Sequence, residues 1–305
     1  MSACATAGGA HALLWRIGPV NPRIKNRLLL LATAFLFSTG GAAIKACSLG
    51  SWQVAGFRSA IASLAVFALV PASRRGLSWR VLPAATAYAA TLILFVTATK
   101  LTTAANAIYL QATAPLYVLA LGPVLLGERI RRSDLFFGAA VATGLGLFFV
   151  ARQGTLATAP NPALGDILGL LSGVGWALTV MGLRWLGKRS DGGGAIATVG
   201  VGNLIACLVS LPMALPVLHS HWTDWLVILY LGLVQIGLAY YCLTRAIGHV
   251  PAFEATTLML LEPALNPVWV WLIQGERPAA LAVVGGAIIL SATLVHTWSE
   301  SRKAP

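Results

Sequence analysis

Charge is scarce in this sequence. Only 10% of its 305 residues are Asp, Glu, Lys or Arg, whereas 58% are hydrophobic. Soluble domains contain about 25% charged residues, so there is too little charge here to cover a water-facing surface. The charge that is present is mostly basic, with 21 Lys and Arg against nine Asp and Glu. The basic residues stand in short groups at the ends of apolar runs, where topology signals occur, so we expect no nucleic-acid partner.

Recognisable catalytic and metal-binding patterns are also missing. The four cysteines, at positions 4, 47, 207 and 242, lack metal-ligand spacing. There is no H-E-x-x-H zinc spacing, no G-x-S-x-G nucleophile elbow and no phosphate-binding glycine loop. We therefore expect no catalytic residue, metal or cofactor, and a protein that is not an enzyme. An integral-membrane enzyme acting on a lipid or small molecule is the alternative class.

Long apolar runs dominate the chain. "LLLLATAFLFSTGGAAI" (28–44) and "DLFFGAAVATGLGLFFVA" (134–151) are two of them. A helix needs about 17–25 residues to cross the hydrocarbon core. The sequence therefore predicts an all-α integral membrane protein with ten transmembrane helices, multi-pass in a bacterial inner membrane. The expected spans are 28–46, 52–70, 80–99, 103–126, 134–151, 165–186, 193–216, 224–245, 251–274 and 279–297.

The distribution of basic residues predicts the orientation. Sixteen of the 21 Lys and Arg residues fall on the side of the N-terminus, four on the other side, and Arg58 lies within a span. Because cytoplasmic loops accumulate Lys and Arg, both termini are expected inside. Residues 1–26 and 298–305 are then cytosolic tails.

A repeat divides the chain. Gly-Glu-Arg occurs at 127–129 and again at 275–277, and the same offset of 148 positions relates Pro115 to Pro263. Two copies of five helices follow, and because five is odd the second copy enters the membrane from the opposite side. This explains why two more arginines follow the first copy, expected in the cytosol, and none follows the second, expected outside. Inverted repeats are typical of secondary transporters.

The two halves resemble a known family. "GFRSAIASL", "ATAPLYVLALGPVLLGERI" and "LLEPALNPVWVWLIQGERP" resemble the drug/metabolite transporter superfamily, EamA type, over roughly residues 28–297. The resemblance implies two EamA-like repeats (27–152 and 164–297) and an exporter of small metabolites such as amino acids. It also implies alternating access around a central cavity between the halves. Where such proteins commonly carry Trp-Gly in the first helix, this chain has Phe37, while Trp176 keeps an aromatic residue in the second half.

Two ionisable residues lie inside expected spans. A charge at the centre of a membrane helix costs about 2.5–3.5 kcal/mol, so such residues are rare and often functional. Arg58 and Glu262 are expected at similar depths, about 20 and 16 Å from the inner face. Glu262 has three interpretations: a protonated, hydrogen-bonded acid, a structural or gating ion pair with Arg58, or a contact to substrate or a coupling proton. For Arg58, the structural interpretation is favoured over substrate binding.

Further candidates for substrate binding are polar or aromatic residues within spans. Met259, Glu262 and Asn266 share one helical face, as do Asn106 and Tyr109. The alternative for the aromatic residues is an interfacial anchor. The remaining candidates are Tyr88, Trp176, Gln235 and Tyr240. The expected partners are a small-molecule substrate and the lipid bilayer; proton coupling and a homodimer are compatible with the sequence.

Overall fold

The fold comes from a computed structural model that describes residues 21–150, 159–189 and 193–274, with scattered residues between 280 and 295. Within these residues every element is helical and none is a strand. The elements are α1 (Pro22–Ser38), α2 (Gly40–Ala46), α3 (Ser51–Leu69), α4 (Pro71–Arg75), η1 (Trp79–Val81), α5 (Leu82–Leu101), α6 (Ala104–Gln111), α7 (Ala114–Leu126), α8 (Arg132–Val150), α9 (Pro162–Arg189), α10 (Gly193–Ala214), α11 (Trp222–Tyr230), η2 (Leu231–Leu238), α12 (Ala239–Ile247), α13 (Ala252–Leu258) and α14 (Leu261–Gln274).

Eight helical segments of the described chain are long and apolar enough to cross a membrane. Large apolar side chains such as Leu64, Phe136 and Leu208 are exposed on the outside of the bundle, as expected for a surface that faces lipid. The prediction of an all-α membrane protein is confirmed. Most of the expected tenth span, 279–297, and the second Gly-Glu-Arg copy, 275–277, lie outside the described residues.

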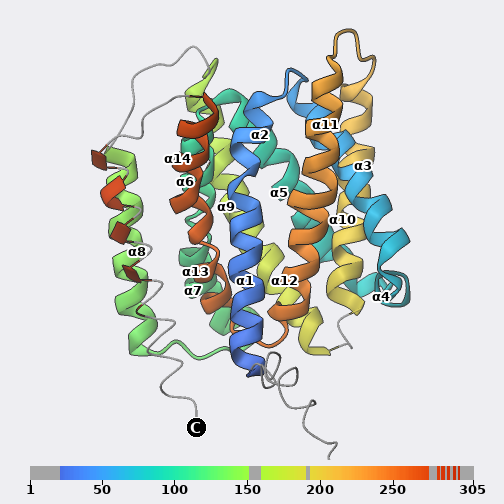
Figure 1. Ribbon diagram of the computed structural model, residues 1–305. Coiled ribbons are helices and arrows are strands. Elements are labelled where there is room, and N and C mark those ends of the chain that lie inside the picture. The colour runs from blue at the N-terminus through green and yellow to red at the C-terminus, as the bar shows by residue number, and fades with distance from the viewer. Residues whose placement is uncertain are drawn as a thin grey trace, which may run out of the picture.

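The two halves of the chain pack into each other. The most extensive contacts join α5 to α9 and α3 to α10, and α1 runs beside α12 and α14, while α8 stands at one edge of the bundle (Figure 1). Glycines on α9 permit the close approach: a Cβ at Gly173 would lie 2.9 Å from the carbonyl oxygen of Leu110. Added Cβ atoms at Gly165 and Gly169 would likewise lie 2.7 Å from the Thr102 nitrogen and 3.0 Å from Leu110 Cβ, so these small residues serve helix packing. The interface between the halves is therefore the core of the protein.

Three expected spans are broken in their middles, whereas the sequence predicted continuous helices. The breaks fall at Thr39, between α6 and α7, and between α13 and α14. Pro115 and Pro263 explain the last two, because proline donates no hydrogen bond and its ring clashes with the carbonyl four residues earlier. The breaks at residues 112–113 and 259–260 obey the repeat offset to within one residue. A fourth span contains the π-helix η2, a geometry frequent at functional sites.

Candidate functional site

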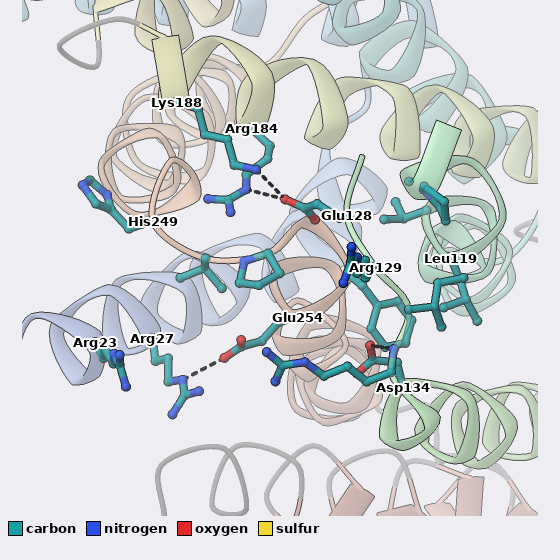
Figure 2. A pocket seen from close by; sticks show the side chains of 18 residues that line it. Arg23, Arg27, Leu119, Glu128, Arg129, Asp134, Arg184, Lys188, His249 and Glu254 are labelled. Carbon is teal, nitrogen blue, oxygen red and sulfur yellow. Dashed lines mark hydrogen bonds and ion pairs between the residues drawn. The ribbon is translucent and has the colours of Figure 1, made fainter. Parts of the chain in front are cut away.

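A large cavity opens at the end of the bundle where α1 begins (Figure 2). Its volume is about 810 Å³, within the range of ligand-binding pockets. The ends of α1, α7, α9 and α13 frame it, and we call it the basic cavity. Its charged and titratable lining includes Arg23, Arg27, Arg129, Arg184, Lys188 and His249, beside Glu128, Asp134 and Glu254.

Glu128 ties three parts of the chain together beside the basic cavity. Its Oε1 accepts hydrogen bonds from Arg184 Nε and Lys188 Nζ, each at 2.9 Å (Figure 2). Its Oε2 accepts a hydrogen bond from the Ala252 N–H at 3.0 Å. Gly127 turns the chain towards this position with φ 64°, a conformation that favours glycine. The first Gly-Glu-Arg copy thus supplies a turn and an ion-pair acceptor at the start of α13, a role that the repeat pattern did not reveal.

The environment of Glu128 favours its charged form. Burial raises the pKa of the carboxyl, and the hydrogen bonds from Lys188, the Ala252 N–H and Arg184 lower it by more, so the pKa lies below its ordinary value. Arg184 is itself buried and also donates to the carbonyl oxygens of Ile247 and Gly248. Both Glu128 and Arg184 therefore have several hydrogen-bond partners within the protein.

A second ion pair spans the same cavity. Arg27 Nε lies 2.7 Å from Glu254 Oε1, with both side chains largely buried (Figure 2). This contact ties α13 to α1. The basic cavity is thus bordered by carboxylates that already hold protein partners.

The central cavity lies between the two halves and is much smaller, about 40 Å³. Four charged or amide side chains line it: Arg58 and Gln111 from the first half, and Gln235 and Glu262 from the second. An adjoining void of about 20 Å³ shares Gln111, Trp176 and Glu262 and is also lined by Met259. Polar groups from both halves therefore converge at one buried place.

Aromatic rings form one wall of the central cavity. Tyr240 lies 5.0 Å from Phe37, 4.7 Å from Tyr88 and 6.1 Å from Trp176 between ring centroids. Phe37 and Trp176 meet edge to face at 6.0 Å, so the phenylalanine takes a place in this wall. Tyr88 is fully buried behind the wall and accepts a hydrogen bond from Asn203 Nδ2 at 3.0 Å.

Arg58 and Glu262 line the same cavity but do not form an ion pair with each other in the described chain. Arg58 is 1% exposed, and its one hydrogen bond is a long contact of 3.4 Å from Nη2 to the Leu92 carbonyl oxygen. The structural ion pair considered from the sequence is therefore not formed here.

The other predicted residues divide into two groups. Trp176, Gln235 and Tyr240 line the central cavity, Met259 lines the adjoining void, and Tyr88 supports the wall from behind. Away from the cavity, Asn106 lies within 3.5 Å of Asp166, Tyr109 packs in an apolar cluster that includes Phe137 of α8, and Asn266 donates to the Ser38 carbonyl oxygen beside the break in α1. The sequence missed Thr91, Phe95 and Gln111 as lining residues; the proline four positions after Gln111 was the available signal.

This arrangement defines the class of protein: a helical membrane transporter, with polar and aromatic groups buried between two halves. The EamA-like transporter family matches residues 25–150 and 163–298, and the chain belongs to this family. The predicted resemblance is confirmed, and the protein is a multi-pass transporter of the bacterial inner membrane rather than an enzyme.

Named relatives and one solved structure extend this comparison. The chain is 28% identical over 276 residues to the pseudopaline exporter CntI of Pseudomonas aeruginosa (strain UCBPP-PA14), covering 88% of this chain and 94% of that protein. It is 27% identical over 187 residues to the threonine/homoserine exporter RhtA of Escherichia coli (strain K12), covering 60% and 61%. A solved structure described as "Crystal structure of protein" is similar in fold, with a TM-score of 0.72 at 19% identity, covering 93% of this chain and 100% of that one.

Proposed function

We propose that this protein exports small metabolites such as amino acids by alternating access around the central cavity. In this proposal ten helices form two inverted repeats, 27–152 and 164–297, flanked by cytosolic tails at 1–26 and 298–305. The end of the bundle that carries the basic cavity faces the cytosol. Substrate enters through the basic cavity, reaches the central cavity and leaves on the opposite side.

One observation carries the proposal. Arg58 and Gln111 from the first half and Gln235 and Glu262 from the second meet around one buried space. Buried polar groups within a membrane are costly unless they have partners or a function. Their position at the interface of two repeats is where transporters of repeated architecture bind substrate.

The relatives support the direction and the kind of cargo. Pseudopaline and threonine or homoserine, named for the two relatives, are small metabolites, and both relatives are exporters. The basic residues around the large cavity support its cytosolic placement, since Lys and Arg accumulate on that side.

The orientation is tested with single cysteines in a variant whose native cysteines are replaced. Cysteines at positions 131 and 303 are expected to react with a membrane-impermeant reagent only from the cytosolic side, and one at 277 only from outside. Equal accessibility at 131 and 277 would overturn the inverted arrangement.

Transport is tested in proteoliposomes loaded with single L-amino acids and with a cytosolic metabolite extract. Liposomes with the protein are expected to lose at least one amino acid faster than protein-free liposomes. If every amino acid and every extract component leaves no faster than from protein-free liposomes, the export proposal is contradicted. A mutant of the central cavity with normal folding but no efflux links the activity to the site.

A further inference from the structure

The guanidinium of Arg58 lacks the partners that a buried arginine needs. The side chain is 1% exposed, its Nε has no hydrogen-bond acceptor, and the one bond it makes is the 3.4 Å contact to Leu92. Arginine stays protonated in proteins and carries five N–H donors. Most of this hydrogen-bonding capacity is therefore directed at no described protein group.

Glu262 is in a similar position on the opposite half of the chain. Its carboxylate takes part in no hydrogen bond or ion pair of the described chain, although it borders both the central cavity and the adjoining void. Opposite charges in a low-dielectric interior attract strongly, so a purely structural pair is expected to close into direct contact. Here the two groups share a cavity and stay apart.

The remaining lining groups are neutral. Gln111 donates to Ser172 Oγ at 2.6 Å, whereas Gln235 Oε1 is buried without a donor. Aromatic rings, Leu92, Ile236 and Thr91, whose hydroxyl donates to the Ala87 carbonyl oxygen, complete the walls. The central cavity therefore presents one cation, one acid, one free amide oxygen and an apolar surface.

We propose that Arg58 and Glu262 bind the two charged ends of a zwitterionic substrate, the carboxylate on Arg58 and the ammonium group on Glu262. This inference rests on the proposed function and assigns the substrate class of the same site. A guanidinium matches a carboxylate with two parallel N–H···O bonds, which gives geometric selectivity. The aromatic wall of Phe37, Trp176 and Tyr240 faces the rest of the substrate.

The central cavity is narrow in this conformation. Its volume of about 40 Å³ is far below the roughly 300–1,000 Å³ of ligand-binding pockets, so an amino acid requires the surrounding segments to separate. Three polar lining residues stand at irregular points of the helices: Gln111 ends α6, Gln235 lies in η2 and Glu262 is near the start of α14. Separation of the segments at these points enlarges the cavity between two groups that are already unpaired.

The test compares amino acids with derivatives that lack one charge. Proteoliposomes are loaded with each L-amino acid, and for those exported, with the matching amide, which has no carboxylate, and the N-acetyl derivative, which has no ammonium group. We expect both derivatives to leave at least about tenfold more slowly, because each leaves one buried charge of the site unpaired. Export of an amino acid with equal rates for both derivatives would overturn the zwitterion inference and leave the exporter proposal standing. Loss of no compound above protein-free liposomes would defeat the exporter proposal itself, and the inference with it.

The Arg58→Gln variant separates recognition from folding. It is expected to fold with an unchanged or raised Tm, to export the amino acid at least about tenfold more slowly, and to discriminate less between the amino acid and its amide. Arg58→Lys keeps the charge and is expected to recover part of this preference. Arg75→Gln, which removes an exposed arginine outside the cavity, is the matched control with unchanged efflux. Unchanged discrimination in Arg58→Gln would contradict carboxylate binding, and misfolding of both Arg58 variants would instead assign the residue a structural role.

Discussion

The basic cavity and the central cavity treat charge in opposite ways. Beside the basic cavity, Glu128 accepts from Arg184, Lys188 and a backbone N–H, and Glu254 pairs with Arg27. In the central cavity Arg58 and Glu262 remain without an ion pair in the described chain. Paired charges hold helices together, whereas a buried guanidinium without an ion pair is costly, and this contrast supports the binding site proposed at the centre.

The two cavities also differ in size, about 810 Å³ against about 40 Å³. The structure is thus wide at one end and narrow at its centre. In the proposed orientation the basic cavity faces the cytosol and leads to the narrow centre, and the ion pairs beside the basic cavity join the helix ends there.

The largest stability effect is expected at Glu128. Glu128→Ala leaves the buried Arg184 without its counter-charge, and breaking a buried pair by removing one partner costs about 3–5 kcal/mol. The free energy of unfolding in detergent, or Tm as its proxy, is the measurement. The double mutant Glu128→Ala/Arg184→Met is expected to recover part of the lost stability. A Glu128→Ala protein as stable as the wild type would contradict the stabilising role of the paired charges beside the basic cavity.

The same cluster is expected to make stability depend on pH. Because the pKa of Glu128 is lowered in the folded protein, its contribution is fully present above the unfolded pKa and is lost as pH falls through the folded pKa. The difference in Tm between the wild type and Glu128→Gln is therefore expected to be largest near neutral pH and to shrink in acid. A difference that grows on acidification contradicts the assigned sign.

The turn before Glu128 is expected to matter less. Gly127→Ala forces an L-residue into the left-handed region, at a cost of about 1–2 kcal/mol. No heavy atom lies within 4 Å of an added Cβ, so the expected loss is conformational rather than steric. Gly146→Ala, in open space on α8 with ordinary helical geometry, is the matched control and is expected not to destabilise the protein. Equal stability of the two variants would contradict the assigned strain.

The smallest effect is expected at the pair of Arg27 and Glu254. Within the described residues Glu254 accepts from one donor, whereas Glu128 accepts from three, so a double-mutant cycle with Arg27→Gln and Glu254→Gln is expected to give a coupling energy of only about 1 kcal/mol. A coupling energy as large as the loss of stability in Glu128→Ala would show that this pair contributes as much as the Glu128 contacts to joining the helix ends at the basic cavity.

Much of the fold was predictable because the membrane imposes strong rules. Apolar length located the described spans, and the Gly-Glu-Arg repeat relates the positions of the helix breaks. Pro263 and Pro267 indicated a weakened helix over 251–274, but the positions of the breaks were not predicted, because hydropathy does not register backbone hydrogen bonds.

The candidate site was predictable only in part. Trp176, Gln235, Tyr240 and Glu262 were found because polar and aromatic groups stand out in apolar runs. Asn266 lies one helical turn after Glu262 on the same face. Its Nδ2 nevertheless donates a hydrogen bond of 3.3 Å to the carbonyl oxygen of Ser38. Helical periodicity predicts which face a side chain lies on but not which residue it contacts. Assigning a role to a residue such as Asn266 therefore requires the tertiary structure.

The most direct test of the central cavity as the transport site is efflux from proteoliposomes by Glu262→Gln, with and without an imposed pH gradient. The variant keeps the size of the side chain but carries no charge and exchanges no proton. Loss of a charge-assisted contact costs about 1.5–3 kcal/mol, so a normally folded variant is expected to export amino acids about tenfold to a hundredfold more slowly. Efflux at the wild-type rate with the wild-type response to pH would contradict the account.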